Sequence, residues 1–170
     1  MLMLKAVLID DEPKGMEILK WELENACPEV EILAMCETGK DGLKAIKEHE
    51  PDVVFLDIEM PYLNGFELLD LVPDVDFDVI FTTAYDQYAL KAFKTTSAVD
   101  YLLKPIDEEE LKKAVERVLE KREQRLALES LDFSNYPDDD EGTVKVDMKN
   151  IALPTFEGLV FIDPKQIIYC

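Results

Sequence analysis

One short stretch, Val53–Asp57, constrains the fold more than any other part of the sequence. Its apolar run is too short for a helix, begins with two β-branched valines and leads directly into a carboxylate. The pair Asn64-Gly65 soon afterwards indicates a turn. Such a run is typical of a buried strand in a parallel sheet. Open α/β sheets bind ligands just outside the carboxyl ends of their strands, so Asp57 stands where this kind of fold carries its chemistry.

The same pattern of strand followed by helix is repeated along the first 120 residues. The apolar runs expected to be strands are 5–9, 30–35, 53–57, 79–81 and 101–103, and a helical pattern follows each of them. These repeats predict a doubly wound parallel α/β sheet with right-handed crossovers. The last helical pattern continues to about residue 128, and its end is charged on nearly every side. We expect that end to project as a linker or as a helical pairing segment, or to be simply a solvated helix end.

Composition restricts the partners and the location. The chain has 38 acidic and 18 basic residues and a formal net charge of −20, which disfavours a broad surface for nucleic acid or anionic membranes. Acidic residues 10–12 interrupt the apolar start before a signal-peptide core can form. No run approaches the roughly 20 apolar residues that a membrane span needs. We therefore expect a cytoplasmic protein without a membrane partner. Its cysteines, Cys27, Cys36 and Cys170, lack the spacing of a zinc or redox site.

Polar side chains gather where the predicted strands end. Asp10 and Asp11 follow the first strand, Asp57 closes the third, and Thr83 and Lys104 follow the fourth and fifth. We expect these carboxylates, the hydroxyl and the ammonium in one crevice. Clustered carboxylates repel one another unless a cation neutralises them. Magnesium, which binds through one or two carboxylates and phosphate oxygens, suits this set of ligands better than zinc does.

This set of residues favours phosphoryl transfer to an aspartate. A carboxylate can attack phosphorus and form an aspartyl phosphate, while a metal, an ammonium and a hydroxyl stabilise the charge of the transferring group. A lone carboxylate at a strand end is more often a loop cap or a surface group, so the hypothesis depends on the whole set. His49, the one histidine, lies on a charged helix end and is expected to be solvated.

The motifs resemble, in order and spacing, those of the receiver domain of bacterial response regulators. They are Ile9–Glu12, Leu56–Pro61 with Gly65, Thr82–Ala84 and Tyr101–Pro105, and the resemblance covers about residues 1–120. It implies a five-stranded, flavodoxin-like sheet of order 2-1-3-4-5. It also implies a two-component phosphoacceptor switch that assists its own phosphorylation and dephosphorylation, rather than an ordinary enzyme.

The resemblance assigns roles to the residues of the crevice. It implies that Asp57 accepts a phosphoryl group from a phosphohistidine of a sensor histidine kinase and that Lys104 pairs with the phosphoryl oxygens. Asp11, Asp57 and the main-chain carbonyl of Glu59 would hold magnesium, and Asp10 would act nearby through water. These assignments come from the matched motifs and not from spacing alone.

Thr83 and Tyr101 are the switch residues that the resemblance implies. Thr83 would shift toward the phosphoryl group and Tyr101 would turn inward behind it. The surface formed by the fourth helix, the fifth strand and the last helix would change, and a homodimer could form through it. Each residue also has a plainer interpretation: Thr83 as a helix cap and Tyr101 as an aromatic residue of an amphipathic strand edge.

The rest of the chain differs in composition. Residues 121–142 are predicted to be a helical extension and an acidic linker, and residues 143–170 short β-strands that resemble the opening of a LytTR-type DNA-binding domain. Such domains need about 100 residues, so we expect this all-β segment to be incomplete. From residue 130 onward the net charge is −5, from 3 basic and 8 acidic residues, the wrong sign for phosphate contacts. We expect the parent protein, and not this chain, to bind DNA and regulate transcription.

Two functions of other classes compete with the receiver hypothesis. A magnesium-dependent phosphatase of the haloacid-dehalogenase type also uses an aspartate nucleophile, but it needs a second aspartate two residues later, where this chain has Glu59. A constitutive binding module would have the same pocket and never be phosphorylated. Phosphorylation of Asp57 distinguishes that module from a receiver.

Overall fold

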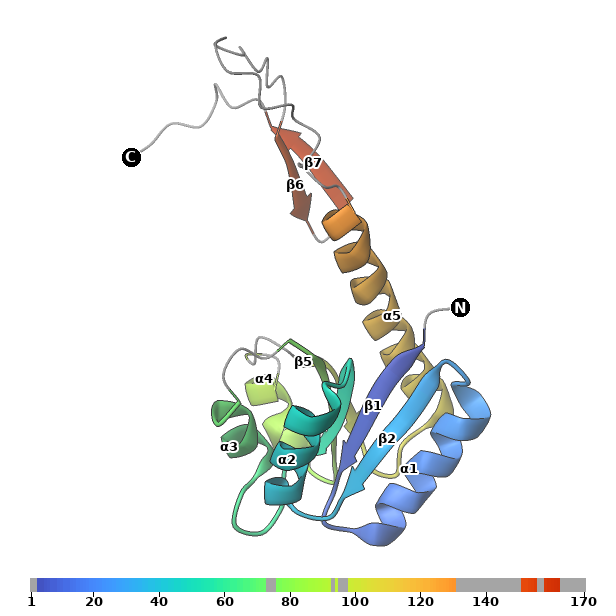
Figure 1. The fold of residues 1–170 in the computed structure, drawn as a ribbon, viewed down its shortest axis with the longest axis vertical. Helices are drawn as coiled ribbons and strands as arrows, with labels where there is room; N and C mark the ends of the chain where they lie inside the picture. The colour runs from blue at the N-terminus through green and yellow to red at the C-terminus, as the bar shows by residue number, and fades with distance from the viewer. Residues whose placement is uncertain are drawn as a thin grey trace. The chain divides into compact units, whose positions relative to one another are not determined.

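The computed structural model describes residues 3–72, 76–92, 94, 98–130, 151–155 and 158–162. The chain divides into two compact units, Met1–Leu131 and Asp132–Cys170. Strands and helices alternate along the larger unit (Figure 1). They are β1 (Leu4–Ile9), α1 (Pro13–Ala26), β2 (Val30–Cys36), α2 (Gly39–His49), β3 (Val53–Asp57), α3 (Gly65–Asp70), β4 (Asp78–Thr83), the 3-10 turn η1 (Asp86–Tyr88), α4 (Ala89–Ala92), β5 (Ala98–Leu103) and α5 (Glu108–Ser130).

The larger unit is built on one parallel sheet. Its strand order is β2-β1-β3-β4-β5, which confirms the predicted flavodoxin-like fold. The central strand β3 is buried along its whole length, as its continuous apolar sequence predicts. Ile9 of β1 lies beside Leu56, and Asp57 lies beside Thr82 of β4. This register brings the carboxyl ends of β1, β3 and β4 to the same edge of the sheet.

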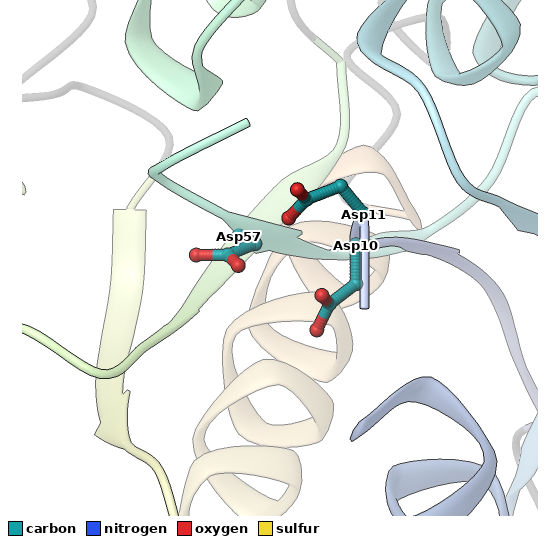
Figure 2. A group of neighbouring side chains, drawn as sticks. All are labelled: Asp10, Asp11 and Asp57. Atoms are coloured by element: carbon teal, nitrogen blue, oxygen red, sulfur yellow. The ribbon is translucent and has the colours of Figure 1, made fainter. Parts of the chain in front are cut away.

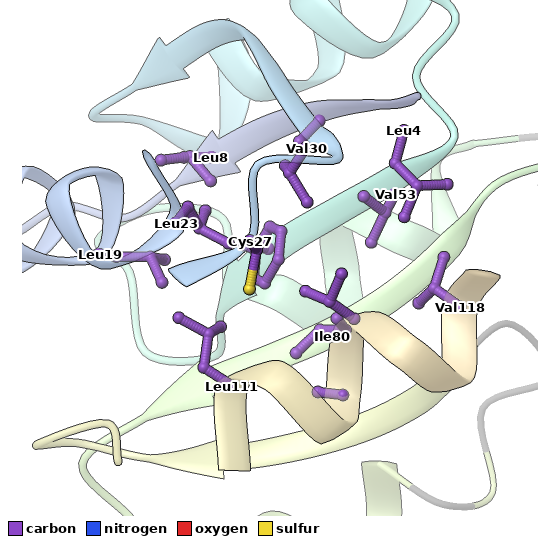
Figure 3. Close-up of a cluster of buried hydrophobic side chains, with 14 of the residues drawn as sticks. Leu4, Leu8, Leu19, Leu23, Cys27, Val30, Val53, Ile80, Leu111 and Val118 are labelled. Carbon is purple, nitrogen blue, oxygen red and sulfur yellow. The ribbon is translucent and has the colours of Figure 1, made fainter. Parts of the chain in front are cut away.

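Helices cover both faces of the sheet, with α1 and α5 on one face and α2, α3 and α4 on the other (Figure 1). Successive side chains of a strand point to opposite faces. Leu4 and Leu8 of β1 therefore join the core under α1 and α5, whereas Val7 and Ile9 join the core on the other side. Figure 3 shows the first of these clusters, in which Leu23 and Leu111 meet the sheet. The two cores hold the strand ends in fixed positions.

Helix α1 buries one face and leaves two large apolar residues in contact with solvent. Met16, Leu19 and Leu23 recur at helical spacing and are buried. Ile18 and Trp21 lie between them in sequence and are 58% and 64% exposed. The apolar content of this helix is therefore greater than its packing on the sheet requires.

Helix α5 continues past the part that packs on the sheet, as its pattern predicts. Its charged end does not simply project, however, because several basic side chains reach back to acids of the sheet. These pairs, called the α5 ion pairs below, are Arg117–Asp100, Lys121–Asp78, Arg122–Asp52 and Arg125–Asp76. The last three ion pairs hold α5 against the amino-terminal ends of β3 and β4. The basic side chains of residues 121–125 therefore contact the larger unit, and the role of this helix end as a linker or a pairing segment stays a prediction.

The smaller unit contains an antiparallel pair, β6 (Ile151–Thr155) and β7 (Gly158–Ile162), in which Ile151 lies opposite Ile162. These strands agree with the prediction for residues 151–162. The predicted linker after residue 130 and the other predicted strands of this segment lie outside the described residues. No helix of the described ranges combines the length and the apolar character needed to span a membrane.

Candidate functional site

Three carboxylates meet at the carboxyl edge of the sheet (Figure 2). Asp10 and Asp11 follow β1, and Asp57 ends β3. One carboxylate oxygen from each residue lies within 4.8 Å of the others. Asp10 and Asp57 are only 3% and 6% exposed, whereas Asp11 is open to solvent. A set made only of oxygen donors, with one side open, fits a hard cation such as Mg²⁺.

Lys104 joins this acidic cluster from the end of β5. Its Nζ lies 2.7 Å from Asp10 Oδ2 and 3.0 Å from Asp57 Oδ2. Its backbone N–H donates a 2.8 Å hydrogen bond to the carbonyl of Thr83, which continues the pairing of β4 with β5. The Lys104–Pro105 peptide bond is cis. The ammonium therefore reaches the two most buried carboxylates at once.

The electrostatics of the cluster reflect burial and mutual pairing. Burial is the largest cause of the raised pKa of Asp57, and the nearby Asp10 charge acts in the same direction, while Lys104 opposes both. Burial alone would lower the pKa of Lys104, but its hydrogen bonds to Asp10 and Asp57 outweigh that effect and raise it. Burial and Asp10 thus disfavour the negative charge of Asp57, and Lys104 favours it.

Thr83 and Tyr101 both contact the main chain of Tyr85. Thr83 is fully buried at the end of β4, and its Oγ1 accepts a hydrogen bond from the Tyr85 N–H at 3.4 Å. Tyr101 is half-buried on β5, and its hydroxyl donates to the Tyr85 carbonyl. The first contact is a local turn and not a helix cap, because the N-cap of η1 is Tyr85 and it receives no side-chain cap hydrogen bond. The two predicted switch residues therefore share one partner, which lies just beyond the site.

Glu59 connects the phosphoacceptor loop to η1. Its N–H donates to Asp57 Oδ1 at 3.3 Å, and its Oε1 accepts a 2.5 Å hydrogen bond from the Tyr88 hydroxyl. That hydrogen bond is the main cause of the raised pKa of Tyr88. Sequence reasoning did not assign Tyr88 to the site, because an aromatic residue next to a helix has the same pattern as a core residue. Only the fold reveals the contact.

The loop after β3 holds Asp57 by close backbone packing. Asn64 caps α3 by accepting hydrogen bonds from the N–H groups of Phe66 and Glu67, and Glu67 completes a capping box. Gly65 donates a 2.9 Å hydrogen bond to the carbonyl of Ile58. A Cβ at position 65 would lie 2.5 Å from the Asp57 carbonyl oxygen. The glycine is therefore needed for the close approach of α3 to the site.

A doubly wound parallel sheet with an acidic cluster and a paired lysine at its carboxyl edge defines a phosphoacceptor switch rather than a classical enzyme. The chain belongs to the family of response regulator receiver domains, whose sequence profile matches residues 6–116. Its function is that of the receiver of a two-component response regulator. Because the chain belongs to this family, the haloacid-dehalogenase type of phosphatase is excluded as its function.

Known relatives agree with this assignment. The chain is 35% identical over 170 residues to the sensory transduction protein LytT of Bacillus cereus, covering 98% of this chain and 65% of the relative. It is 40% identical over 121 residues to the transcriptional regulatory protein BtsR of Escherichia coli, covering 71% of this chain and 50% of the relative. The chain thus spans about half to two thirds of the length of these relatives.

Solved structures agree as well. The REC domain of AraT, a response regulator from Geobacillus stearothermophilus, matches with a TM-score of 0.66 and 31% sequence identity. That match covers 74% of this chain and 99% of the AraT chain. The likeness therefore extends over almost the whole of that receiver domain.

Proposed function

We propose that Asp57 is the phosphoacceptor and takes its phosphoryl group from a phosphohistidine of a sensor histidine kinase. A carboxylate oxygen of Asp57 attacks phosphorus as the bond from phosphorus to the imidazole nitrogen breaks. The electron pair of that bond stays on the nitrogen, and a proton already carried by the other ring nitrogen lets the group leave as neutral imidazole. The observation that carries this proposal is the position of Asp57, buried at the end of the central strand within reach of Asp10, Asp11 and Lys104.

The neighbouring groups would serve the same step. Asp11, Asp57 and the main-chain carbonyl of Glu59 would hold Mg²⁺, with Asp10 acting through water. The bound ion would neutralise charge on the acids and on the phosphoryl oxygens. Lys104, which pairs with two carboxylates in this structure, would exchange Asp57 for a phosphoryl oxygen once that carboxylate is phosphorylated.

The shared contact with Tyr85 supports the switch roles of Thr83 and Tyr101. If the Thr83 hydroxyl turned to donate to the phosphoryl group, its hydrogen bond with the Tyr85 N–H would be lost. The Tyr85 peptide could then move and release the Tyr101 hydroxyl from its carbonyl. A local charge change would in this way reach the surface of α4, β5 and α5, through which a homodimer could form.

The parent protein would be a transcriptional regulator of the LytTR type. The match to LytT extends over nearly the whole chain, and BtsR is named as a transcriptional regulator. Residues 1–120 would be the receiver, 121–142 the helical extension and linker, and 143–170 the beginning of a DNA-binding domain. DNA binding is assigned to the parent and not to this chain, whose residues from 130 onward carry a net charge of −5 (3 basic, 8 acidic).

The test is phosphorylation by acetyl phosphate, followed by intact mass, with and without Mg²⁺. We expect the chain to gain one phosphoryl group in a Mg²⁺-dependent reaction, and the Asp57→Asn variant to gain none. Sedimentation of the phosphorylated sample measures dimer formation. A chain that gains nothing, under conditions where another receiver domain is phosphorylated, would overturn the proposal in favour of the constitutive binding module.

A further inference from the structure

The Tyr88 hydroxyl holds the side chain of Glu59, which is the first exposed residue after Asp57 in the sequence. Glu59 is exposed, two residues beyond Asp57, and its backbone N–H already donates to the Asp57 carboxylate. Its side chain does not extend freely, because its Oε1 is held 2.5 Å from the Tyr88 hydroxyl. This hydrogen bond joins the loop after β3 to η1, two segments that are 29 residues apart.

The placement of Tyr88 is set by the hydrophobic core. Its ring meets Phe66 edge-on, with centroids 6.2 Å apart, and the Phe66 ring lies 5.1 Å from that of Phe81. Phe66 and Phe81 are buried, so the Tyr88 ring packs against side chains that the core holds in place. The ring of Tyr85 also meets it edge-on, with centroids 6.3 Å apart. The hydroxyl is therefore positioned independently of Glu59 and can orient the carboxylate.

Electrostatics give this contact a function. The site already holds three carboxylates, and Lys104 is the cation paired with them in the described part of the chain. A freely rotating Glu59 would bring a fourth negative charge to the path of any phosphoryl donor, which is itself an anion. A hydrogen bond from a neutral phenol spreads the carboxylate charge and restricts its position.

We propose that Tyr88 is a positioning residue, which holds the Glu59 carboxylate aside so that an anionic phosphoryl donor can reach Asp57. The inference rests on the proposed function, since it concerns the same phosphorylation step. It adds a residue to that step which touches neither the donor nor Asp57. It also makes the rate of phosphorylation depend on the placement of η1.

The test compares phosphorylation rates with two donors of different charge, acetyl phosphate as the dianion and phosphoramidate as the monoanion. The variants are Tyr88→Phe, Glu59→Gln and the double variant, and Tyr62→Phe is the control because Tyr62 is fully exposed. Tyr88→Phe keeps the aromatic contacts and removes only the hydroxyl. We expect it to slow phosphorylation by acetyl phosphate about three- to tenfold, the range expected for the net contribution of one ordinary, solvent-exposed hydrogen bond.

Two further results are expected if the mechanism is electrostatic. The loss should be smaller with phosphoramidate, and Tyr88→Phe should have no effect when Glu59 is already glutamine, because no charge is left to restrain. Equal slowing with both donors, or slowing that persists in the double variant, would show a merely structural role and overturn the inference. If the unmodified chain accepts no phosphoryl group at all, the proposed function fails instead.

Discussion

Replacing Gly65 by alanine tests whether the packing of α3 against β3 sets the position of the phosphoacceptor. The added Cβ would lie 2.5 Å from the Asp57 carbonyl oxygen and 3.2 Å from both Ile58 Cα and Leu56 Cγ. Two of these three atoms belong to the backbone, so no rotation of a side chain can relieve the closest contact. Either α3 or the end of β3 must move.

The size of the effect follows from these distances. Ordinary contact begins near 3.4 Å, so the carbonyl oxygen and the new Cβ must separate by about 0.9 Å (3.4 − 2.5). β3 is the central strand and is fully buried, which leaves little room for such a shift. We expect a loss of about 1 to 3 kcal/mol in the free energy of unfolding. A displacement of this size at a reacting group reduces the rate by about 100-fold.

The assay pairs chemical denaturation with the rate of phosphorylation by acetyl phosphate. Gly15→Ala in α1 is the matched control, because its added Cβ would meet the flexible Glu12 carboxylate at 3.4 Å and Asp10 Oδ2 at 3.7 Å, which are ordinary contact distances that require no movement. Alanine there should stabilise the helix by about 0.5 to 1 kcal/mol and leave the phosphorylation rate unchanged. A Gly65→Ala variant with the stability and the rate of the unmodified chain would refute the reasoning.

Three further predictions concern the ion pairs and the buried thiol. Lys121→Met should lower the free energy of unfolding by about 1 to 3 kcal/mol in denaturant titration, because it leaves the Asp78 carboxylate, 5% exposed, without its cation. Lys104→Met should bind Mg²⁺ about tenfold more tightly by calorimetry, because the ammonium no longer competes for the Asp10 and Asp57 oxygens. Burial raises the pKa of Cys27 from 9.0 to about 11, so unfolding should become easier, by about 2 to 3 kcal/mol, as pH rises between these values.

Each of these predictions has its own control. Lys112→Met removes an ion pair between exposed side chains of α5 and should leave stability unchanged, and an equal loss in both lysine variants would contradict the first prediction. Weaker Mg²⁺ binding by Lys104→Met would contradict the second. The sign of the third follows because the folded thiol keeps its proton at a pH where the unfolded thiol has lost it. Cys27→Ala should therefore show a flatter decline over the same pH range, and identical slopes would exclude the thiol as the cause.

The fold and the acidic cluster could be predicted because their determinants are local in sequence. An apolar run that ends in a carboxylate marks both a buried strand and its functional end, as at Asp57. Parallel pairing then brings such ends together without further information. The same reasoning placed Asp10 and Lys104 at the edge where the structure has them.

Contacts made by side chains across the fold could not be predicted in this way. The Tyr88–Glu59 hydrogen bond spans 29 residues, and the Lys121–Asp78 pair spans 43. Neither pair has a characteristic spacing, because each depends on the distance between two elements after packing. The charged end of α5 was expected to project for this reason: its sequence shows the basic residues but not the acids that meet them.

The α5 ion pairs have a mechanical consequence. Helix α5 begins shortly after Lys104, at the carboxyl edge of the sheet, where the acidic cluster lies. Its later turns form ion pairs with Asp52 and Asp78 at the opposite, amino-terminal edge. With 23 residues it is about 34 Å long. One continuous helix thus extends from one edge of the sheet to the other. A tilt of the helix imposed near Lys104 would therefore displace its last turn, at Ser130, with the ion pairs as the point about which the helix turns.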